Sequence, residues 1–479
     1  MTLKTAVRNK KVSEIRKIVK ETPIADLAEM LEKIPTTQLG FFFRVLGVRE
    51  AGKLFAFLDH EKQELIIKLL SDKEQKTILE NIYADDIVDI IEEMPSNISK
   101  QILKNTPKDK RSDINKLLRY KDNQTGSIMS IDMVEIKQTL SCYNAIKLIR
   151  QEYQNIEDTS NYYVVNSKGQ LVGAVKLQSL VFADENKKVK DVMTPVGSVL
   201  TTMDKESATL EFAKHDSSTL PVINSQGYLT GMITSDDIID TIQEEATEDI
   251  HKMAGIENID NSYLKISIIK LFRSRVLWIL LLMISATLSQ IVLDGFINIA
   301  DKTLGQTAKG VAITGTITSS LIAIVPVISG SAGNAGAQSS TMITRSIALG
   351  EIKGKDIFNV LKKEIFTGAM IGITLSIVNF IRLIIYYAVQ GSRFNQQVNI
   401  LVSSNTKDIV LLWIAFASSI SLFVIIIFAK TIGGALPLIA KKLKLDPAVM
   451  AAPLLTTLID ALSILIFFGI SIGIIIMVI

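Results

Sequence analysis

An acidic side chain, Asp460, lies inside the apolar stretch LLTTLIDALSILIFF (454–468). An uncompensated charge at the centre of a membrane costs at least ~2.5–3.5 kcal/mol, so Asp460 needs a partner or a function. Thr456 lies one helical turn away on the same face, and Pro453 is expected to free backbone carbonyls near Val449. Carboxylate, hydroxyl and carbonyl oxygens in one stripe suit a hard, hydrated cation, and no His or Cys joins them to favour zinc or copper.

A second polar stretch, PVISGSAGNAGAQSSTMITRSIALGEI (326–352), ends another apolar segment. Small residues let helix backbones approach closely, and amide side chains in a membrane must find partners in protein or water. Helix packing alone accounts for Gly333 and Gly336, but less well for Asn334 and Gln338. We therefore expect Asn334, Gln338 and Pro453 to line a pore.

An acidic segment, DDIIDTIQEEATEDI (236–250), precedes the apolar half of the chain. Carboxylates at i,i+4 on a helix repel by a few tenths of a kcal/mol per pair, so something should offset them. A solvated acidic helix is one interpretation. The other is a sensor in which divalent cations bridge the acids and their loss lets the helix shift. Between 236 and 249 there are seven acids and no base: Asp236, Asp237, Asp240, Glu244, Glu245, Glu248 and Asp249.

The N-terminal part, residues 1–125, carries a 12-residue repeat between 34 and 107 in which apolar helix faces alternate with turns. Such units stack in pairs, which predicts an all-helical superhelix. In YADDIVDIIEEMP, Asp85 and Asp89 lie one helical turn apart. They are interpreted either as a solvated face or as half of a cation-binding surface.

Residues 126–247 contain a second repeat, in which NSKGQLVGAV (166–175) matches NSQGYLTGMI (224–233). Each copy predicts strand, helix, strand, turn and strand. The pair resembles a tandem CBS module, a type of regulatory unit that often binds adenosine nucleotides such as ATP through a Thr/Ser-x-x-Asp carboxylate. Thr234 and Asp237 fit that pattern, whereas the first copy has Lys176 and Ser179. A purely structural module is the alternative.

Five membrane spans are expected from Val276 onward, at 276–298, 310–344, 363–390, 408–431 and 447–479. A connecting segment, 236–275, precedes them, and its last part, from 256 onward, predicts an amphipathic helix. The connections 345–363 and 430–447 carry nine Lys or Arg residues, and the other two carry four. The positive-inside rule then places the N-terminus in the cytoplasm and the C-terminus outside. The net charge of +3 is spread out, which argues against nucleic acid, and the single Cys142 fits a reducing compartment.

Together, the motifs SGSAGNAGAQSSTMITRSIALGEI and LDPAVMAAPLLTTLIDALSILIFF and the order of the segments resemble the MgtE-type magnesium transporters and channels. The resemblance implies a multi-domain membrane protein with a helical superhelical N-domain, a tandem CBS (α+β) module, a long connecting helix and a five-helix pore domain (276–479). It also implies a homodimer in the cell membrane with one pore at the subunit interface. Two positions depart from the family pattern, Ala332 in place of the first of two glycines and Ala452 where many members have Gly or Asn.

Carried over by motif, Asp460 is the pore carboxylate and the Thr456 backbone lines its Mg²⁺ site. The resemblance places the Mg²⁺-sensing acids at Asp85, Asp89, Asp204, Glu206, Asp216, Asp237, Asp240, Glu245, Glu248 and Asp249.

Three functions compete at this stage. The first is a Mg²⁺ channel gated by intracellular Mg²⁺, and the second is a proton- or sodium-coupled carrier of Mg²⁺ or Co²⁺ with Asp460 as the relay. A carrier would more often show further membrane acids, and only Asp294 and Glu364 lie near span ends. The third is a membrane-anchored sensor without flux, which would have no reason to keep Asp460. The scattered residues His60, His215 and His251 support no enzyme.

Overall fold

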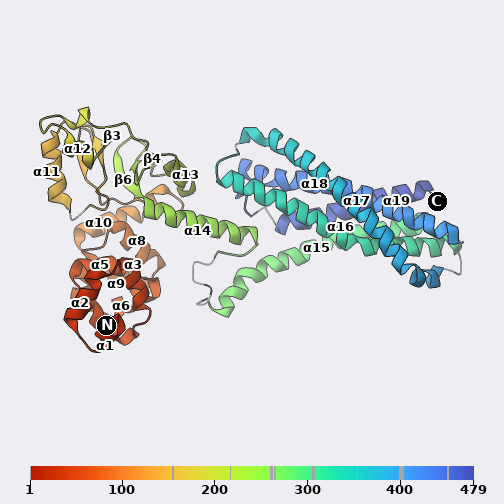
Figure 1. Ribbon diagram of the computed structural model, residues 1–479, viewed down its shortest axis with the longest axis horizontal. Helices are drawn as coiled ribbons and strands as arrows, with labels where there is room; N and C mark the ends of the chain where they lie inside the picture. Colours follow the sequence, from red (N-terminus) through yellow and green to blue (C-terminus); the bar gives the residue numbers. More distant parts are fainter. Residues whose placement is uncertain are drawn as a thin grey trace. The chain divides into compact units, whose positions relative to one another are not determined.

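The computed structural model (Figure 1) describes residues 2–153, 156–215, 217–258, 263, 266–304, 308–352, 354–398, 404–449 and 453–478. The chain divides into two units, Met1–Gln243 and Glu244–Ile479, and each is described by itself. The expected sites at Asp216 and Ala452 lie outside the described residues.

The first unit begins with ten short helices. From α3 onward, a new helix starts every 12 residues, as the repeat predicts, because Pro or a capping residue such as Asp59 or Ser71 stands before most of the starts. The helices are α1 Leu3–Arg8, α2 Val12–Glu21, α3 Ile24–Leu31, α4 Thr36–Val45, α5 Val48–Ala56, α6 His60–Leu69, α7 Asp72–Leu79, α8 Ala84–Glu93, α9 Ser96–Asn105 and α10 Lys108–Leu117.

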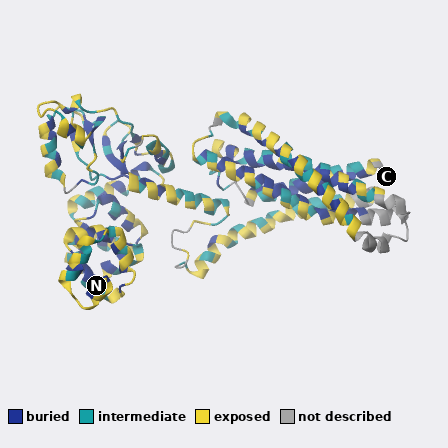
Figure 2. Cartoon of the chain, viewed as in Figure 1, coloured by how far each residue is buried: buried dark blue, intermediate teal, exposed yellow. Residues whose placement is uncertain are grey.

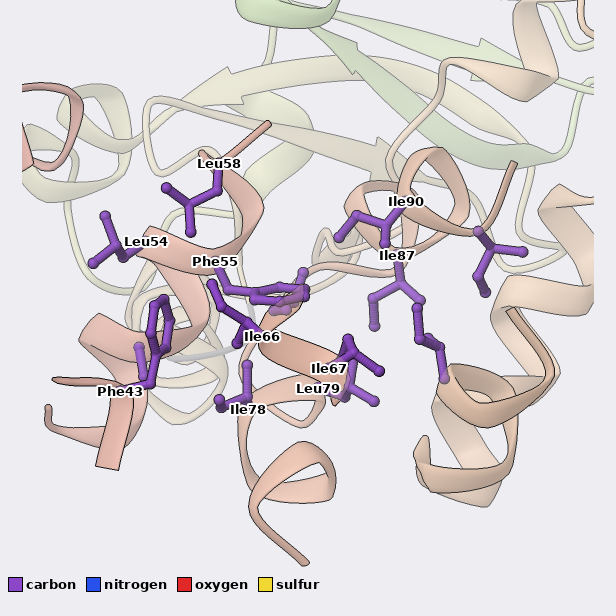
Figure 3. Close-up of a cluster of buried hydrophobic side chains, with 14 of the residues drawn as sticks. Phe43, Leu54, Phe55, Leu58, Ile66, Ile67, Ile78, Leu79, Ile87 and Ile90 are labelled. Atoms are coloured by element: carbon purple, nitrogen blue, oxygen red, sulfur yellow. The ribbon is translucent and has the colours of Figure 1, made fainter. Parts of the chain in front are cut away.

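These helices stack so that each contacts the next but one, as α3 does with α5, α5 with α7 and α7 with α9. Figure 3 shows the apolar side chains that fill the space between them, among them Phe43 of α4, Phe55 of α5 and Ile66 of α6. All three are buried, and rings of neighbouring helices such as Phe43 and Phe55 pack edge to face. The predicted helical superhelix is confirmed.

Two small sheets follow with the same topology. In each, the first two strands pair in parallel and the last two are antiparallel, with a register shift at the same place, Val164/Val165 and Val222/Ile223. The turns contain Gly169 and Gly227 at φ +86° and +82°, where only glycine is unstrained. The first copy is η1 Thr125–Ser127, β1 Glu135–Lys137, α11 Cys142–Glu152, β2 Asn161–Val165, β3 Leu171–Lys176 and α12 Leu177–Phe182. The second is η3 Val189–Asp191, β4 Val199–Leu200, α13 Lys205–His215, β5 Thr219–Ile223, β6 Leu229–Thr234 and α14 Ser235–Met253.

Helix α14 carries the acidic segment as one continuous helix and ends at Met253. The amphipathic helix predicted for 256–275 is absent at 256–258, which form irregular chain, whereas 268–275 are helical as the start of the next long helix. Residues 259–262, 264 and 265 of this prediction lie outside the described residues. Gly255, at φ +66°, ends α14 in the left-handed conformation that glycine favours.

The second unit holds five helices long and apolar enough to cross a membrane, which confirms five spans. They are α15 Ile268–Leu304, α16 Ala308–Ala348, α17 Ile357–Val398, α18 Ser404–Lys442 and α19 Pro453–Val478, with η5 Gly354–Asp356 before α17. Their outward faces carry exposed apolar side chains such as Leu281, Phe366 and Ile381, as a lipid-facing surface requires (Figure 2).

Two sequence-based predictions about these helices are wrong. Pro453 is the first residue of α19 and so interrupts no hydrogen bond inside that helix, contrary to the expected break that would free carbonyls one turn earlier. Lys430 was placed in a connection, but α18 continues through Pro437 to Lys442 and buries Lys430. Without Lys430, the connections 345–363 and 430–447 still carry more basic residues than the other two connections.

Small residues hold the membrane helices together. Gly336 of α16 and Gly433 of α18 meet so closely that a Cβ on Gly433 would overlap the carbonyl oxygen of Gly336. On the adjacent face of α16, a Cβ on Gly333 would lie 3.7 Å from the methyl carbon of Thr456 in α19. The small-residue stretch is therefore the seam along which α16 contacts α18 and α19.

The Gly336–Gly433 contact predicts that a single added methyl group lowers the stability of the protein at Gly433 but not at an uncrowded glycine. Gly433→Ala should force α16 and α18 apart and lower the melting temperature in detergent, because the overlapped atom is backbone and cannot rotate away. Gly469→Ala on α19 is the control, since nothing lies within 4 Å of the added Cβ. Equal melting temperatures for both variants would contradict the close contact.

Candidate cation-binding sites

Asp460 lies where α19 contacts α16. The hydroxyl of Ser329 in α16 donates a hydrogen bond to Asp460 Oδ1. Asp460 is partly buried, and no basic side chain forms an ion pair with it among the residues that the structure describes. A carboxylate held by one hydroxyl keeps most of its acceptor capacity for another ligand.

The predicted pore-lining residues of α16 lie on one stripe. Asn334 and Gln338 are both exposed in the single chain, and Pro326 and Gly330 continue the stripe at the same four-residue spacing. Each of these positions would face lipid if nothing covered it, and an exposed amide in hydrocarbon is costly. The stripe is therefore suited to water or to another protein surface.

A second acidic site forms in the first unit at the start of α8. The backbone N–H of Ala84 donates to Asp132 Oδ2 at 2.9 Å, and the Tyr83 hydroxyl donates to the carbonyl of Ile156 at 3.2 Å. These bonds place Asp85 against the sheet module with only 7% of its surface exposed. Its Oδ1 has no hydrogen-bond partner among the described residues, so Asp85 is an acid removed from water and not yet satisfied.

Several carboxylates crowd around Asp85, and burial is the main cause of their shifted pKa values. Burial and then the charge of Glu157 raise the pKa of Asp85 well above its usual range. Burial likewise raises the pKa of Glu157 to about 8 and that of Asp86, beside Asp236, to about 6. Raised pKa values on several neighbouring carboxylates mark a place where positive charge is scarce.

Asp237, a candidate for both cation and nucleotide binding, belongs to the same cluster. The Thr234 hydroxyl donates to Asp237 Oδ2 at 2.6 Å, which lowers its pKa, but burial outweighs this bond and raises that pKa to about 7. Asp236 and Asp86 add to the rise. The two residues of the Thr-x-x-Asp pattern are thus brought together, next to acids of α8.

In the second unit, the end of α14 is tied to the segment that precedes α19. Lys252 Nζ lies 2.6 Å from Glu248 Oε1 and 2.7 Å from Asp446 Oδ2. Asp446 Oδ1 also accepts the backbone N–H of Ala448, which shapes the turn before α19. Burial and the Asp446 charge raise the pKa of the adjacent Asp249. One ammonium thus lies among three carboxylates.

The remaining predicted ligands are dispersed. Asp89 and Asp240 are exposed, Glu206 and Glu245 are partly exposed, and Asp204 accepts the backbone N–H of Ser207 at the start of α13. In the described part of the chain, no three Asp, Glu, His or Cys side chains are arranged to hold a metal ion directly. The acids are therefore near one another without forming a finished coordination shell.

Sequence reasoning missed several residues that the structure brings to these sites. Ser329 was seen only as one of many small residues, and Asp132 and Glu157 lie in segments with no acidic pattern. Lys252 had a detectable signal, because it stands four residues after Glu248, a spacing typical of a helical ion pair.

Five long apolar helices, an oxygen-donor site between two of them and acidic clusters outside them define a membrane transport protein for cations. Residues 325–470 match the family described as MgtE, divalent cation transporter. Residues 22–123 match the MgtE intracellular N domain, and 189–244 match the CBS domain. The chain belongs to the MgtE family, a family of transporters and not of enzymes.

Relatives along most of the chain carry the same family name. The magnesium transporter MgtE of Thermus thermophilus is 29% identical over 362 residues, which cover 75% of this chain and 72% of that protein. The magnesium transporter MgtE of Bacillus subtilis is 28% identical over 389 residues, covering 81% and 77%. A crystal structure of the cytosolic domain of the Mg²⁺ channel MgtE in complex with ATP aligns with 50% of this chain and 98% of that one, at 25% identity and a TM-score of 0.47.

The acidic cluster predicts an unusual pH dependence in Mg²⁺-free buffer. The folded pKa values of Glu157 and Asp237, about 8 and about 7, lie above the ordinary 4.5 and 3.8. The folded state then binds more protons than the unfolded state, so the free energy of unfolding falls as pH rises from roughly 4 to 8. The melting temperature of the cytosolic part of the full chain should be lower at pH 8 than at pH 6, and added Mg²⁺ should restore it.

Glu157→Gln provides the control for this effect, because it removes one of the crowded carboxylates and should flatten the pH dependence. Glu185→Gln, at an exposed position shortly after α12, should leave it unchanged. A melting temperature that rises with pH would contradict the interpretation.

Proposed function

We propose that the protein transports Mg²⁺ across the cell membrane along a path that includes Asp460. The observation that carries this proposal is the position of Asp460, which lies where α19 contacts α16 and accepts a hydrogen bond from Ser329. The polar side chains of these helices offer hydroxyl and amide groups. Thr456 lies one turn before Asp460, against Gly333. Hard oxygen ligands favour Mg²⁺ over zinc or copper, and the named relatives are magnesium transporters.

A homodimer with the path between its subunits follows from the exposed stripe of α16. Asn334 and Gln338 are exposed in one subunit and would meet their own copies in a two-fold pair. Two Asp460 carboxylates close together would repel unless a divalent cation lay between them. In this proposal the domains are 1–125, 126–247, 236–275 and 276–479, with the N-terminus in the cytoplasm and the C-terminus outside.

Gating by intracellular Mg²⁺ is the second part of the proposal. The acids around Asp85 and Asp237 share a buried region with too little positive charge, so an ion that enters there stabilises the contact between α8 and the sheet module. The same helix α14 that carries Asp237 ends in the Lys252–Asp446 pair, next to the turn before α19. Ion binding at one end of α14 can therefore act on the pore helix at the other.

An adenosine nucleotide is a second candidate ligand of the sheet module. The Thr234–Asp237 hydrogen bond has the geometry of a carboxylate oriented for hydroxyl groups. Asp237 also lies among acids, which would repel nucleotide phosphates unless Mg²⁺ accompanied them. We infer that any nucleotide binds as its Mg²⁺ complex, and binding of ATP with and without Mg²⁺ to the full chain tests this.

Asp460→Ala should abolish Mg²⁺ uptake into proteoliposomes while the protein still assembles, because it removes the carboxylate that would bind the ion. Asp460→Asn keeps the shape and the bond from Ser329 but should also fail, which separates charge from packing. Asp294→Asn is the control, since Asp294 is an exposed acid near the end of α15. Normal Mg²⁺ uptake by Asp460→Ala would refute the pore. Uptake that depends on a proton or sodium gradient would instead favour the carrier.

Lys252→Gln should weaken the link between α14 and the turn before α19. Glu248, Asp249 and Asp446 would then repel one another, and more Mg²⁺ would be needed to hold α14 in place. Patch recordings with Mg²⁺ varied on the cytoplasmic side should show half-closure at a Mg²⁺ concentration up to about tenfold higher, equivalent to ~1.4 kcal/mol.

The charge reversal Lys252→Asp with Asp446→Lys should restore closure, and Lys442→Gln at the exposed end of α18 should change nothing. Currents that ignore cytoplasmic Mg²⁺ even in the unmodified protein would refute gating itself.

A further inference from the structure

Three polar side chains from three membrane helices meet away from the Asp460 site. Ser339 of α16, Glu364 of α17 and Lys430 of α18 are 1%, 8% and 6% exposed. The Ser339 hydroxyl donates to Glu364 Oε2 at 2.5 Å, and Lys430 Nζ lies 3.9 Å from the same oxygen. One carboxylate oxygen therefore joins all three helices.

The surrounding glycines leave this cluster little room to rearrange. A Cβ on Gly434 would lie 3.0 Å from Glu364 Cγ, and one on Gly368 would lie 3.3 Å from Lys430 Cβ. The helices approach closely here because these positions have no side chain. The carboxylate is consequently held in one place by packing as well as by charge.

A buried ion pair contributes little net stability, because the cost of removing both charges from water offsets their attraction. What the pair does provide is the Lys430 ammonium 3.9 Å from the carboxylate oxygen that accepts the Ser339 hydrogen bond, and hydrogen bonds to members of an ion pair are stronger than those between neutral groups. The donor of that bond is Ser339, the residue directly after Gln338. The pair thus acts on α16.

We propose that Glu364 is a positioning residue that fixes the rotation and depth of α16 through Ser339, and so sets where Asn334 and Gln338 point. The other polar anchor of α16 is Ser329 with Asp460, ten residues or roughly 15 Å earlier along the helix. Asn334 lies between the two anchors. The importance of this placement for ion passage rests on the proposed function, whereas the placement itself does not.

The adjacent serine supplies a matched control. Ser340 is as buried as Ser339, at 0% exposed, yet its hydroxyl has no hydrogen-bond partner among the described residues. Replacing either serine by alanine removes one oxygen from the same turn of the same helix. Only Ser339→Ala breaks the connection to Glu364.

Thiol labelling of the full chain in proteoliposomes tests the proposal, because Cys142 is the only native cysteine and Cys142→Ser removes it. In this background, Gln338→Cys should react faster with a water-soluble maleimide than Ala337→Cys, since position 338 is exposed and 337 partly exposed. Adding Ser339→Ala should reduce that ratio of rates by about threefold or more, as expected for loss of a charged hydrogen bond, and adding Ser340→Ala should leave it unchanged.

An unchanged ratio in Ser339→Ala, or equal changes in Ser339→Ala and Ser340→Ala, would overturn the proposal. Equal reaction rates of Gln338→Cys and Ala337→Cys in the protein that keeps both Ser339 and Ser340 would also overturn it. If Glu364→Gln fails to fold because Lys430 is left unpaired, the double variant Glu364→Gln with Lys430→Met should restore folding and show the Ser339→Ala labelling pattern.

Mg²⁺ uptake measured on the same variants should fall several-fold for Ser339→Ala only. If the labelling rates change as expected but even the protein with Ser339 intact takes up no Mg²⁺, the positioning role of Glu364 is supported and only the proposed transport function is refuted.

Discussion

The structure depends on how each carboxylate that has left water is compensated. Glu364 and Asp446 are each paired with a lysine of the same chain, Lys430 and Lys252. The Asp460 carboxylate accepts a hydrogen bond from the Ser329 hydroxyl and forms no ion pair among the described residues. In the same part of the chain, Asp85 has an oxygen without a hydrogen-bond partner. Because burial penalises an uncompensated charge, the second kind of carboxylate must hold a proton or bind a cation from outside.

This difference divides the acids into fixed contacts and binding groups. A lysine compensates its carboxylate at every Mg²⁺ concentration, so the Glu364 pair behaves as part of the scaffold and the Asp446 pair as a permanent half of the link to α14. Asp460 forms no ion pair with a lysine or arginine among the described residues. Near Asp85, the charge of Lys110 lowers the pKa of Asp86 and Asp132, but burial outweighs it and both pKa values stay raised. The state of these carboxylates depends on what the solution supplies, which is what sensing and transport both require.

Local sequence signals predicted the elements well and the contacts between distant residues poorly. The 12-residue spacing of helix starts and the two matched Gly turns were readable because caps and turns are set by neighbouring residues. Pro453 and Lys430 were misplaced because apolar windows do not show where a helix begins or that a buried charge has a partner. The Ser329–Asp460 and Ala84–Asp132 bonds join residues 131 and 48 positions apart, a distance at which one sequence carries no pairing signal.

In the proposed gating, helix α14 connects the acids around Asp237 with the segment before α19. It runs unbroken through 19 residues, with Asp237 near its start and Lys252 near its end, and a regular helix transmits displacement because its backbone bonds resist bending. Cation binding near Asp237 relieves repulsion that otherwise favours separation of α14 from α8. Since Lys252 pairs with Asp446 without any added ion, the proposed gating by Mg²⁺ would act at the Asp237 end of α14, where burial and neighbouring acids raise the pKa of Asp237.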